Sequence, residues 1–166
     1  MRGFTLIETL VAISVLTMII IGPLSLATKS IGASLVSQNQ ITAFYLGQEA
    51  IEYILNIRDN NFLQRLGWLT GLDSCLGING CYVDVPNNTI NSCSGSCPKI
   101  KYDGTGGFYY NYQTGQDTIF TRVVKIKKIS IGGNEDEARI EVIISWPEKS
   151  GGQKSFTLQE DIFNWK

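Results

Sequence analysis

Hydrophobic positions follow different periods in different parts of the chain. Residues 4–26 are almost uninterruptedly apolar, and a helix of this length, at about 1.5 Å per residue, spans a hydrocarbon core of roughly 30 Å. From residue 30 to residue 58, apolar side chains recur at steps of three and four, which is the period of one helix face. This face comprises Ala43, Leu46, Ala50, Ile54 and Ile57, widened by Phe44, Ile51 and Leu55. The pattern predicts one long helix with a transmembrane half over 4–29 and an amphipathic half over 30–58.

The last third of the chain, residues 118–165, alternates between apolar and polar side chains, as a strand with one buried face does. Polar turns at 132–133 and 149–152 divide it into three strands. The apolar positions are Phe120, Val124, Ile126, Ile140, Val142, Ile144, Trp146, Phe156, Leu158 and Ile162. The buried face of such a meander needs a cover, which the amphipathic half of the helix supplies. The predicted fold class for residues 30–166 is therefore α+β, with the long helix packed on an antiparallel sheet of three or four strands.

Residues 60–115 are rich in Gly, Asn, Ser and Asp, which predicts a long loop. Four cysteines lie within it, at Cys75, Cys81, Cys93 and Cys97. An even number of cysteines in such a segment of an exported chain favours disulfides, with three possible connectivities. Free thiols and a four-thiolate zinc site are the alternatives, although the spacings C-x5-C and C-x3-C differ from the C-x2-C pairs of zinc ribbons.

Three further runs have both a structural and a binding interpretation. The aromatic run 108–112 is expected to be a strand, with an exposed contact surface for a sugar or a partner protein as the alternative. The Gly- and Asp-rich runs 103–107 and 132–137 are expected to be turns, because neither has the ligand spacing of an EF-hand calcium loop. We therefore predict no metal site in these runs.

Composition argues against several classes of function. The chain has 166 residues, a formal net charge of −1 and a pI of about 5.4, whereas a nucleic-acid-binding domain usually carries a basic patch. It has no histidine, which removes the commonest general base. It also has neither a G-x-S-x-G elbow nor a phosphate-binding glycine loop. We expect no enzyme activity, no cofactor and no nucleic-acid partner.

Glu8 is a carboxylate inside the membrane-length apolar segment. A charged side chain there costs roughly 2.5–3.5 kcal/mol on insertion scales and usually marks a function. The segment itself offers no partner for this charge. The position of Glu8 therefore indicates that another subunit supplies one.

The string Gly3-Phe4-Thr5-Leu6-Ile7-Glu8, after a short basic leader, resembles the N-terminal signature of type IV pilins and type II secretion pseudopilins. The resemblance implies a leader over 1–3 that a prepilin peptidase removes by cutting between Gly3 and Phe4, followed by N-methylation of Phe4. It also implies that Glu8 meets the N-terminal amine of a neighbouring subunit. It further implies a pilin-like fold.

A second run, Gln48-Glu49-Ala50-Ile51-Glu52 followed by Asn56-Ile57-Arg58-Asp59, resembles minor pilins of the PilV kind and I-type pseudopilins. This motif is less specific than the N-terminal signature. A solvated helix face whose charges support the helix is the preferred explanation of these residues taken locally.

Two other interpretations of the N-terminus stay open. Ser25-Leu26-Ala27 is similar to the cleavage site of a conventional signal peptide, although the apolar region is longer than usual and contains Glu8. Alternatively, an uncleaved anchor lets Glu8 reach the interface with its flexible side chain. Arg2 precedes the apolar segment and Lys29 follows it, which gives a small bias toward a cytoplasmic N-terminus and an external head.

These observations lead us to expect a structural subunit, a minor pilin or pseudopilin, that waits in the inner membrane and then joins or primes a filament at the cell surface. Its expected partners are the prepilin peptidase and other pilin or pseudopilin subunits. The size and cysteine content of the head favour a pilus over a type II secretion pseudopilus, and a DNA-uptake apparatus stays open. The alternatives are a membrane-anchored extracellular binding or adhesion domain and a secreted enzyme behind a signal peptide.

Overall fold

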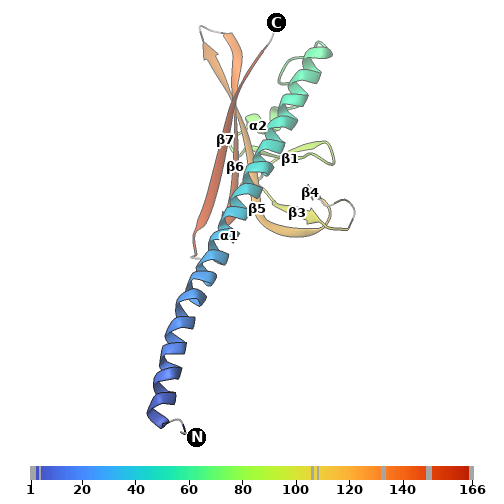
Figure 1. Cartoon of the computed structure of the whole chain (residues 1–166). Coiled ribbons are helices and arrows are strands. Elements are labelled where there is room, and N and C mark those ends of the chain that lie inside the picture. Colours follow the sequence, from blue (N-terminus) through green and yellow to red (C-terminus); the bar gives the residue numbers. More distant parts are fainter. Residues whose placement is uncertain are drawn as a thin grey trace. The chain divides into compact units, whose positions relative to one another are not determined.

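A computed structural model of the chain describes residue 3 and residues 5–105, 107, 109–131, 134–148 and 151–164. It divides into two compact units, Met1–Gln40 and Ile41–Lys166, which we call the helical unit and the head unit. One helix, α1 (Leu6–Leu63), contributes to both (Figure 1). The predicted long N-terminal helix is therefore confirmed.

The ends of α1 have local causes. At its start, the Glu8 N–H donates to the Thr5 carbonyl over 3.1 Å. The helix continues through Pro23 and ends at Leu63, a little beyond the predicted end at residue 58. There the Leu66 N–H donates to the Asn61 carbonyl over 2.9 Å, and Arg65 adopts a left-handed conformation with φ 57°. A left-handed residue after the last turn is a common way to end a helix and redirect the chain.

The strands that the structure describes in the head unit belong to one antiparallel sheet. The described strands are β1 (Cys81–Asp84), β2 (Thr89–Ser92), β3 (Lys99–Asp103), β4 (Tyr109–Asn111), β5 (Gln116–Ile131), β6 (Asn134–Pro147) and β7 (Gln153–Phe163). They follow the order β2-β1-β5-β3-β4, while β6 pairs with both β5 and β7. The long strands β5, β6 and β7 form the predicted meander (Figure 1).

The sheet corrects two predictions, because it has seven strands rather than three or four, and the segment 60–115 is not a long loop. That segment contains the short helix α2 (Asp73–Leu76) and the strands β1 to β4, each only three to five residues long. Strands this short have too few positions for a visible alternation of apolar and polar residues. Their composition therefore indicated a loop.

The core of the head unit lies between α1 and the meander. Its helix side is the predicted amphipathic face, in which Ala43, Leu46, Ala50 and Ile54 are buried. Its sheet side comprises the buried residues Val124, Ile126, Ile140, Val142, Ile144 and Ile162. At Gly47 the helix approaches the sheet so closely that an added Cβ would overlap the Leu158 side chain. The α+β arrangement of helix on antiparallel sheet is therefore confirmed.

Two disulfides pair the four cysteines. Cys75 of α2 is joined to Cys81 at the start of β1, and Cys93 is joined to Cys97. The pairing agrees with the disulfide interpretation and selects the connectivity of nearest neighbours in sequence. Within the described residues there is also no group of three or more His, Cys, Asp or Glu side chains that could hold a metal ion.

The predicted turns lie partly outside the described residues. This applies to 132–133, to residues 149–150, and to Phe108 and Gly106 in the runs 108–112 and 103–107. Within 103–107, the Asp103 carboxylate accepts hydrogen bonds from the N–H and hydroxyl of Thr105 over 2.9 and 2.7 Å, as in a polar turn. Tyr109 and Tyr110 lie in β4, in agreement with the strand interpretation of the aromatic run.

Candidate functional site

The residues predicted for processing and assembly lie around the start of α1. Gly3 has open space on the side where a Cβ would project, and Phe4 lies outside the described residues. Glu8 is exposed in the first turn of α1. In the described part of the chain its carboxylate has no hydrogen-bond or ion-pair partner. The structure therefore brings no other predicted residue to Glu8.

The helical unit is suited to an apolar environment. Its large apolar side chains, including Leu10, Ile13, Ile20 and Leu24, are all exposed. Four of its hydroxyl groups donate to carbonyl oxygens one turn back within the helix, from Thr9, Ser14, Thr17 and Thr28, over 2.8–2.9 Å. Polar groups in lipid must be satisfied internally because no water is available there. By length and composition, α1 could cross a membrane.

Exposed apolar side chains continue beyond a membrane-length segment. The 21 residues from Leu6 to Leu26 already span roughly 30 Å at about 1.5 Å per residue. Ile31, Leu35 and Val36 follow in the helical unit and are also exposed. In the head unit, Ile41, Phe44 and Tyr45 of α1 are exposed as well. Large exposed apolar side chains in such number usually mark an interaction site.

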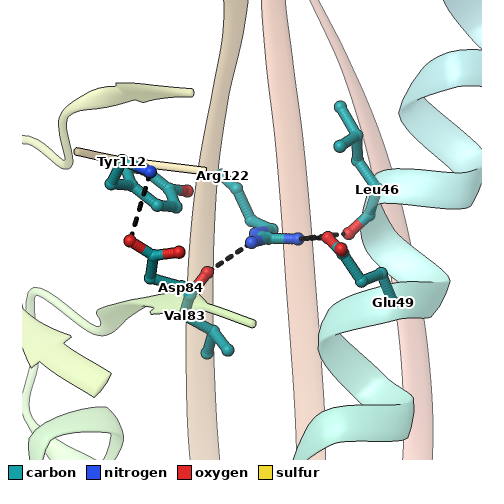
Figure 2. Close-up of polar contacts among 6 residues, drawn as sticks. All are labelled: Leu46, Glu49, Val83, Asp84, Tyr112 and Arg122. Atoms are coloured by element: carbon teal, nitrogen blue, oxygen red, sulfur yellow. Dashed lines mark hydrogen bonds and ion pairs between the residues drawn. The ribbon is translucent and has the colours of Figure 1, made fainter. Parts of the chain in front are cut away.

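A buried polar network in the head unit was not predicted. It is centred on Arg122 of β5, whose side chain is only 2% exposed on the sheet face that meets α1. Its Nη1 donates to the Leu46 carbonyl over 2.8 Å and to the Glu49 carboxylate over 2.7 Å. Its Nη2 donates to the Val83 carbonyl of β1. Figure 2 shows the guanidinium between the helix and β1, joined to both.

Tyr112 and Asp84 extend this network. The Arg122 Cζ lies 5.8 Å from the Tyr112 ring centroid, within the range of a cation–π contact. The Tyr112 N–H donates to the buried Asp84 carboxylate over 3.2 Å (Figure 2). The Asn87 amide donates to the same carboxylate oxygen over 3.0 Å. The network therefore joins α1, β1, β5 and the residue that follows β4.

The charge of Arg122 is stabilised despite its burial. Burial lowers the pKa of the guanidinium, but Tyr112 and Glu49 raise it by more, so the pKa lies above its ordinary value. Burial also raises the pKa of Tyr112, against the opposite effect of the Arg122 charge. Arg122 therefore stays cationic and Tyr112 stays neutral at neutral pH. No reactive pair results, and the network's chemistry is that of a structural link between helix and sheet.

Sequence reasoning missed this network for an identifiable reason. Glu49 was assigned to a solvated helix face together with Glu52. That assignment holds for Glu52, whose carboxylate accepts a hydrogen bond from Gln48 over 3.0 Å at the surface. It is wrong for Glu49, which is only 33% exposed and paired with Arg122. The signal was Arg122 itself, a charged residue between the apolar Phe120 and Val124 on the buried side of the alternation in β5.

Comparison of the chain with models of protein families, with curated proteins and with solved structures found no match in any of the three.

Proposed function

We propose that this chain is a structural subunit of a helical filament, a minor pilin or pseudopilin of the type IV pilus class. The observation that carries the proposal is the row of exposed apolar side chains on α1, which is longer than a bilayer requires and has at its start the Glu8 carboxylate, for which the described residues supply no partner. The N-terminal signature that precedes Glu8 supports the same class. The head is larger and richer in cysteine than expected for a minimal I-type pseudopilin, which favours a pilus over a type II secretion pseudopilus.

Before assembly, the subunit waits in the inner membrane with its N-terminus in the cytoplasm and its head outside. Lipid covers the segment from Leu6 to Leu26, where helix packing and polar pairing rather than the hydrophobic effect drive association. Ile31, Leu35 and Val36 follow this segment. Helices of neighbouring subunits cover them in the filament, and each Å² of apolar area leaving water contributes about 25 cal/mol.

Glu8 sets the axial position of one subunit against the next. After a prepilin peptidase cuts between Gly3 and Phe4, the new amine of one subunit lies near Glu8 of another. Because both charges are expensive in an apolar bundle, their pairing favours one register over its alternatives. Glu8 is therefore an intermolecular residue in this proposal, and the described chain leaves it unpartnered for that reason.

The proposal is tested by incorporation of a Glu8→Ala variant into filaments. Glu8→Ala should insert and be cleaved normally, yet its amount in sheared filaments should fall at least about tenfold, which corresponds to roughly 1.4 kcal/mol. Glu52→Ala is the matched control, because it removes a glutamate from the solvated face of the same helix. Mass spectrometry of the mature chain should find Phe4 as the N-terminus.

Three results would contradict the proposal. Wild-type amounts of Glu8→Ala in filaments would remove the assembly role of Glu8. A mature chain that starts at Thr28 would indicate a conventional signal peptide, and an intact Met1 would indicate an uncleaved anchor.

A second candidate function, a membrane-anchored binding domain, has one observation in its favour. An apolar pocket of about 250 Å³ in the head unit lies between the last turns of α1 and the end of β7, lined by Phe62, Leu63, Trp68 and Phe163. An anchored binding domain predicts that the chain remains in membranes and is absent from filaments when all assembly components are present. The same fractionation therefore separates the two functions.

A further inference from the structure

A groove of about 610 Å³ lies on the outer face of the sheet in the head unit. Its floor includes Lys125, Lys127, Arg139 and Glu141, which alternate along β5 and β6 with the buried residues Ile126 and Ile140. Because successive side chains of a strand point to opposite faces, this floor faces away from α1. One wall of the groove stands beside this floor and is formed at and just after the end of α2, by Leu76, Gly77 and Ile78.

The floor of the groove carries unneutralised positive charge. Lys127 is directly opposite Arg139 in the β5–β6 register, and like charges in this position destabilise a sheet. Arg139 is already paired with Asp161, whose two oxygens accept from it over 2.7 and 2.9 Å. In the described chain, Lys127 has no ion-pair partner. The fold therefore tolerates the two like charges of Lys127 and Arg139 directly opposite each other.

Lys125 adds a second ammonium group. It is opposite Glu141 in the register, but the Glu141 carboxylate accepts a hydrogen bond from the Gln159 amide over 3.1 Å. No ion pair joins Lys125 to Glu141 in the described structure. Two lysines on adjacent positions of the same strand face are thus available to an anionic ligand.

The rim of the groove is apolar. Ile78 is 91% exposed, an unusual position for a large aliphatic side chain, and the half-buried Leu76 lies two residues before it. A ligand that covered Ile78 would gain hydrophobic contact in addition to charge pairing. The ligand that fits this combination carries both carboxylates and an apolar side chain.

We propose that the groove binds an acidic segment of another protein, with carboxylates on Lys125 and Lys127 and an apolar side chain against Ile78. A nucleic-acid strand fits less well, because Glu141 and Asp161 on the same sheet face would repel a continuous row of phosphates. The occupant is therefore a peptide with separated carboxylates. This inference does not depend on filament assembly, since it concerns only the head unit.

Fluorescence anisotropy tests the groove with the full chain in uncharged detergent micelles. The probe is a fluorescein-labelled peptide of repeated Glu-Leu-Glu units, and a peptide of Gln-Leu-Gln units is the neutral reference. We expect the acidic peptide to bind and the neutral one to bind much more weakly. The double variant Lys125→Gln/Lys127→Gln should bind the acidic peptide about fivefold more weakly, as expected for two exposed charge contacts.

Two matched variants separate specific from general attraction. Lys99→Gln/Lys101→Gln removes the same charge from β3, outside the groove, and should change binding less than twofold. Ile78→Ser should weaken binding in high salt as well as in low salt, whereas the effect of the groove lysines should fade as salt screens exposed charges. Circular dichroism of each variant should match the wild-type chain.

Three outcomes would overturn the proposal. The first is the absence of binding of the acidic peptide. The second is equal weakening by the Lys99→Gln/Lys101→Gln variant, which would indicate attraction by net charge alone. The third is an oligodeoxythymidine that binds as tightly as the acidic peptide and depends on the same lysines, which would assign the groove to nucleic acid.

Discussion

The two units of this protein each place a charged side chain in apolar surroundings, but they treat it differently. In the head unit, Arg122 is buried and is bonded to Leu46, Glu49 and Val83 of the same chain. In the helical unit, Glu8 is exposed among apolar side chains and the described chain gives it no partner. A buried charge that is bonded within its own chain links parts of the fold, whereas a charge to which the described chain gives no partner is available to another molecule. This difference motivates the assembly proposal.

The largest effect expected from this comparison is the loss of stability on replacing Arg122. Arg122→Met removes the link between α1 and β1 and leaves the two carbonyl groups and Glu49 without this donor. Because Glu49 remains partly exposed and can be hydrated, we expect the free energy of unfolding to fall by about 3 kcal/mol, the lower end of the range for broken buried pairs. Urea unfolding of the full chain in detergent, followed by tryptophan fluorescence, measures it.

Two controls make this result specific. Arg139→Met removes an exposed arginine from the neighbouring strand and should lower the free energy of unfolding much less than Arg122→Met does, because solvent screens its ion pair. Glu8→Ala should change the same unfolding free energy by less than about 0.5 kcal/mol, as a surface substitution does. If Arg122→Met also costs less than 1 kcal/mol, partners within the chain do not hold the buried charge, and the contrast with Glu8 fails.

Substitution of Tyr112 should change the free energy of unfolding less than Arg122→Met does, and in the opposite direction. Its buried hydroxyl meets no group at hydrogen-bond geometry in the described structure, although it lies close enough to Arg122 for each group to affect the pKa of the other, and its ring contacts Arg122 and Tyr82. Removing an unsatisfied polar group while keeping the ring is neutral or favourable. Tyr112→Phe should therefore leave the free energy of unfolding unchanged or raise it by up to about 1 kcal/mol. A loss of more than 1 kcal/mol would show that the hydroxyl makes a bond that stabilises the fold.

The sequence predicted the elements that repeat an apolar pattern several times and missed most of those formed by a few residues. The helix and the three long strands were predictable because each repeats its apolar pattern several times, as in the face from Ala43 to Ile54. The strands β1 to β3 were missed because they are too short to repeat a pattern, whereas β4 lies within the aromatic run 108–112 for which a strand was predicted. Of these strands, β1 and β3 pair with β5, while β2 pairs with β1 and β4 pairs with β3, and such pairing depends on tertiary structure.

The candidate sites also differ in whether a local sequence pattern could predict them. Glu8 was predictable because its surroundings are sequential neighbours, so an acid in an apolar run is visible in one line of sequence. The partners of Arg122 are 39 to 76 residues away along the chain, and no local pattern connects them. The groove lysines were likewise invisible, because the register that places Lys127 opposite Arg139 is set by the β5–β6 pairing.

The smallest expected effect concerns the ion pair between Arg139 and Asp161 at the surface of the head unit. This pair is exposed, unlike Arg122, but it has its partner within the chain, unlike Glu8. The pKa of Asp161 is lowered from 3.8, chiefly by the hydrogen bonds that its carboxylate accepts from Arg139. Since its folded-state pKa lies below the unfolded value, the pair stabilises the fold above the ordinary pKa and loses this contribution as the pH falls through the lowered one.

NMR titration of the Asp161 carboxyl carbon should therefore show a higher pKa in Arg139→Gln than in the wild-type chain. Lys154→Gln, which breaks the separate pair with Glu148, should leave that titration unchanged. Identical curves for the wild-type chain and Arg139→Gln would mean that solvent, rather than Arg139, holds this carboxylate, and that Arg139 is free to repel Lys127 or to bind a ligand in the groove.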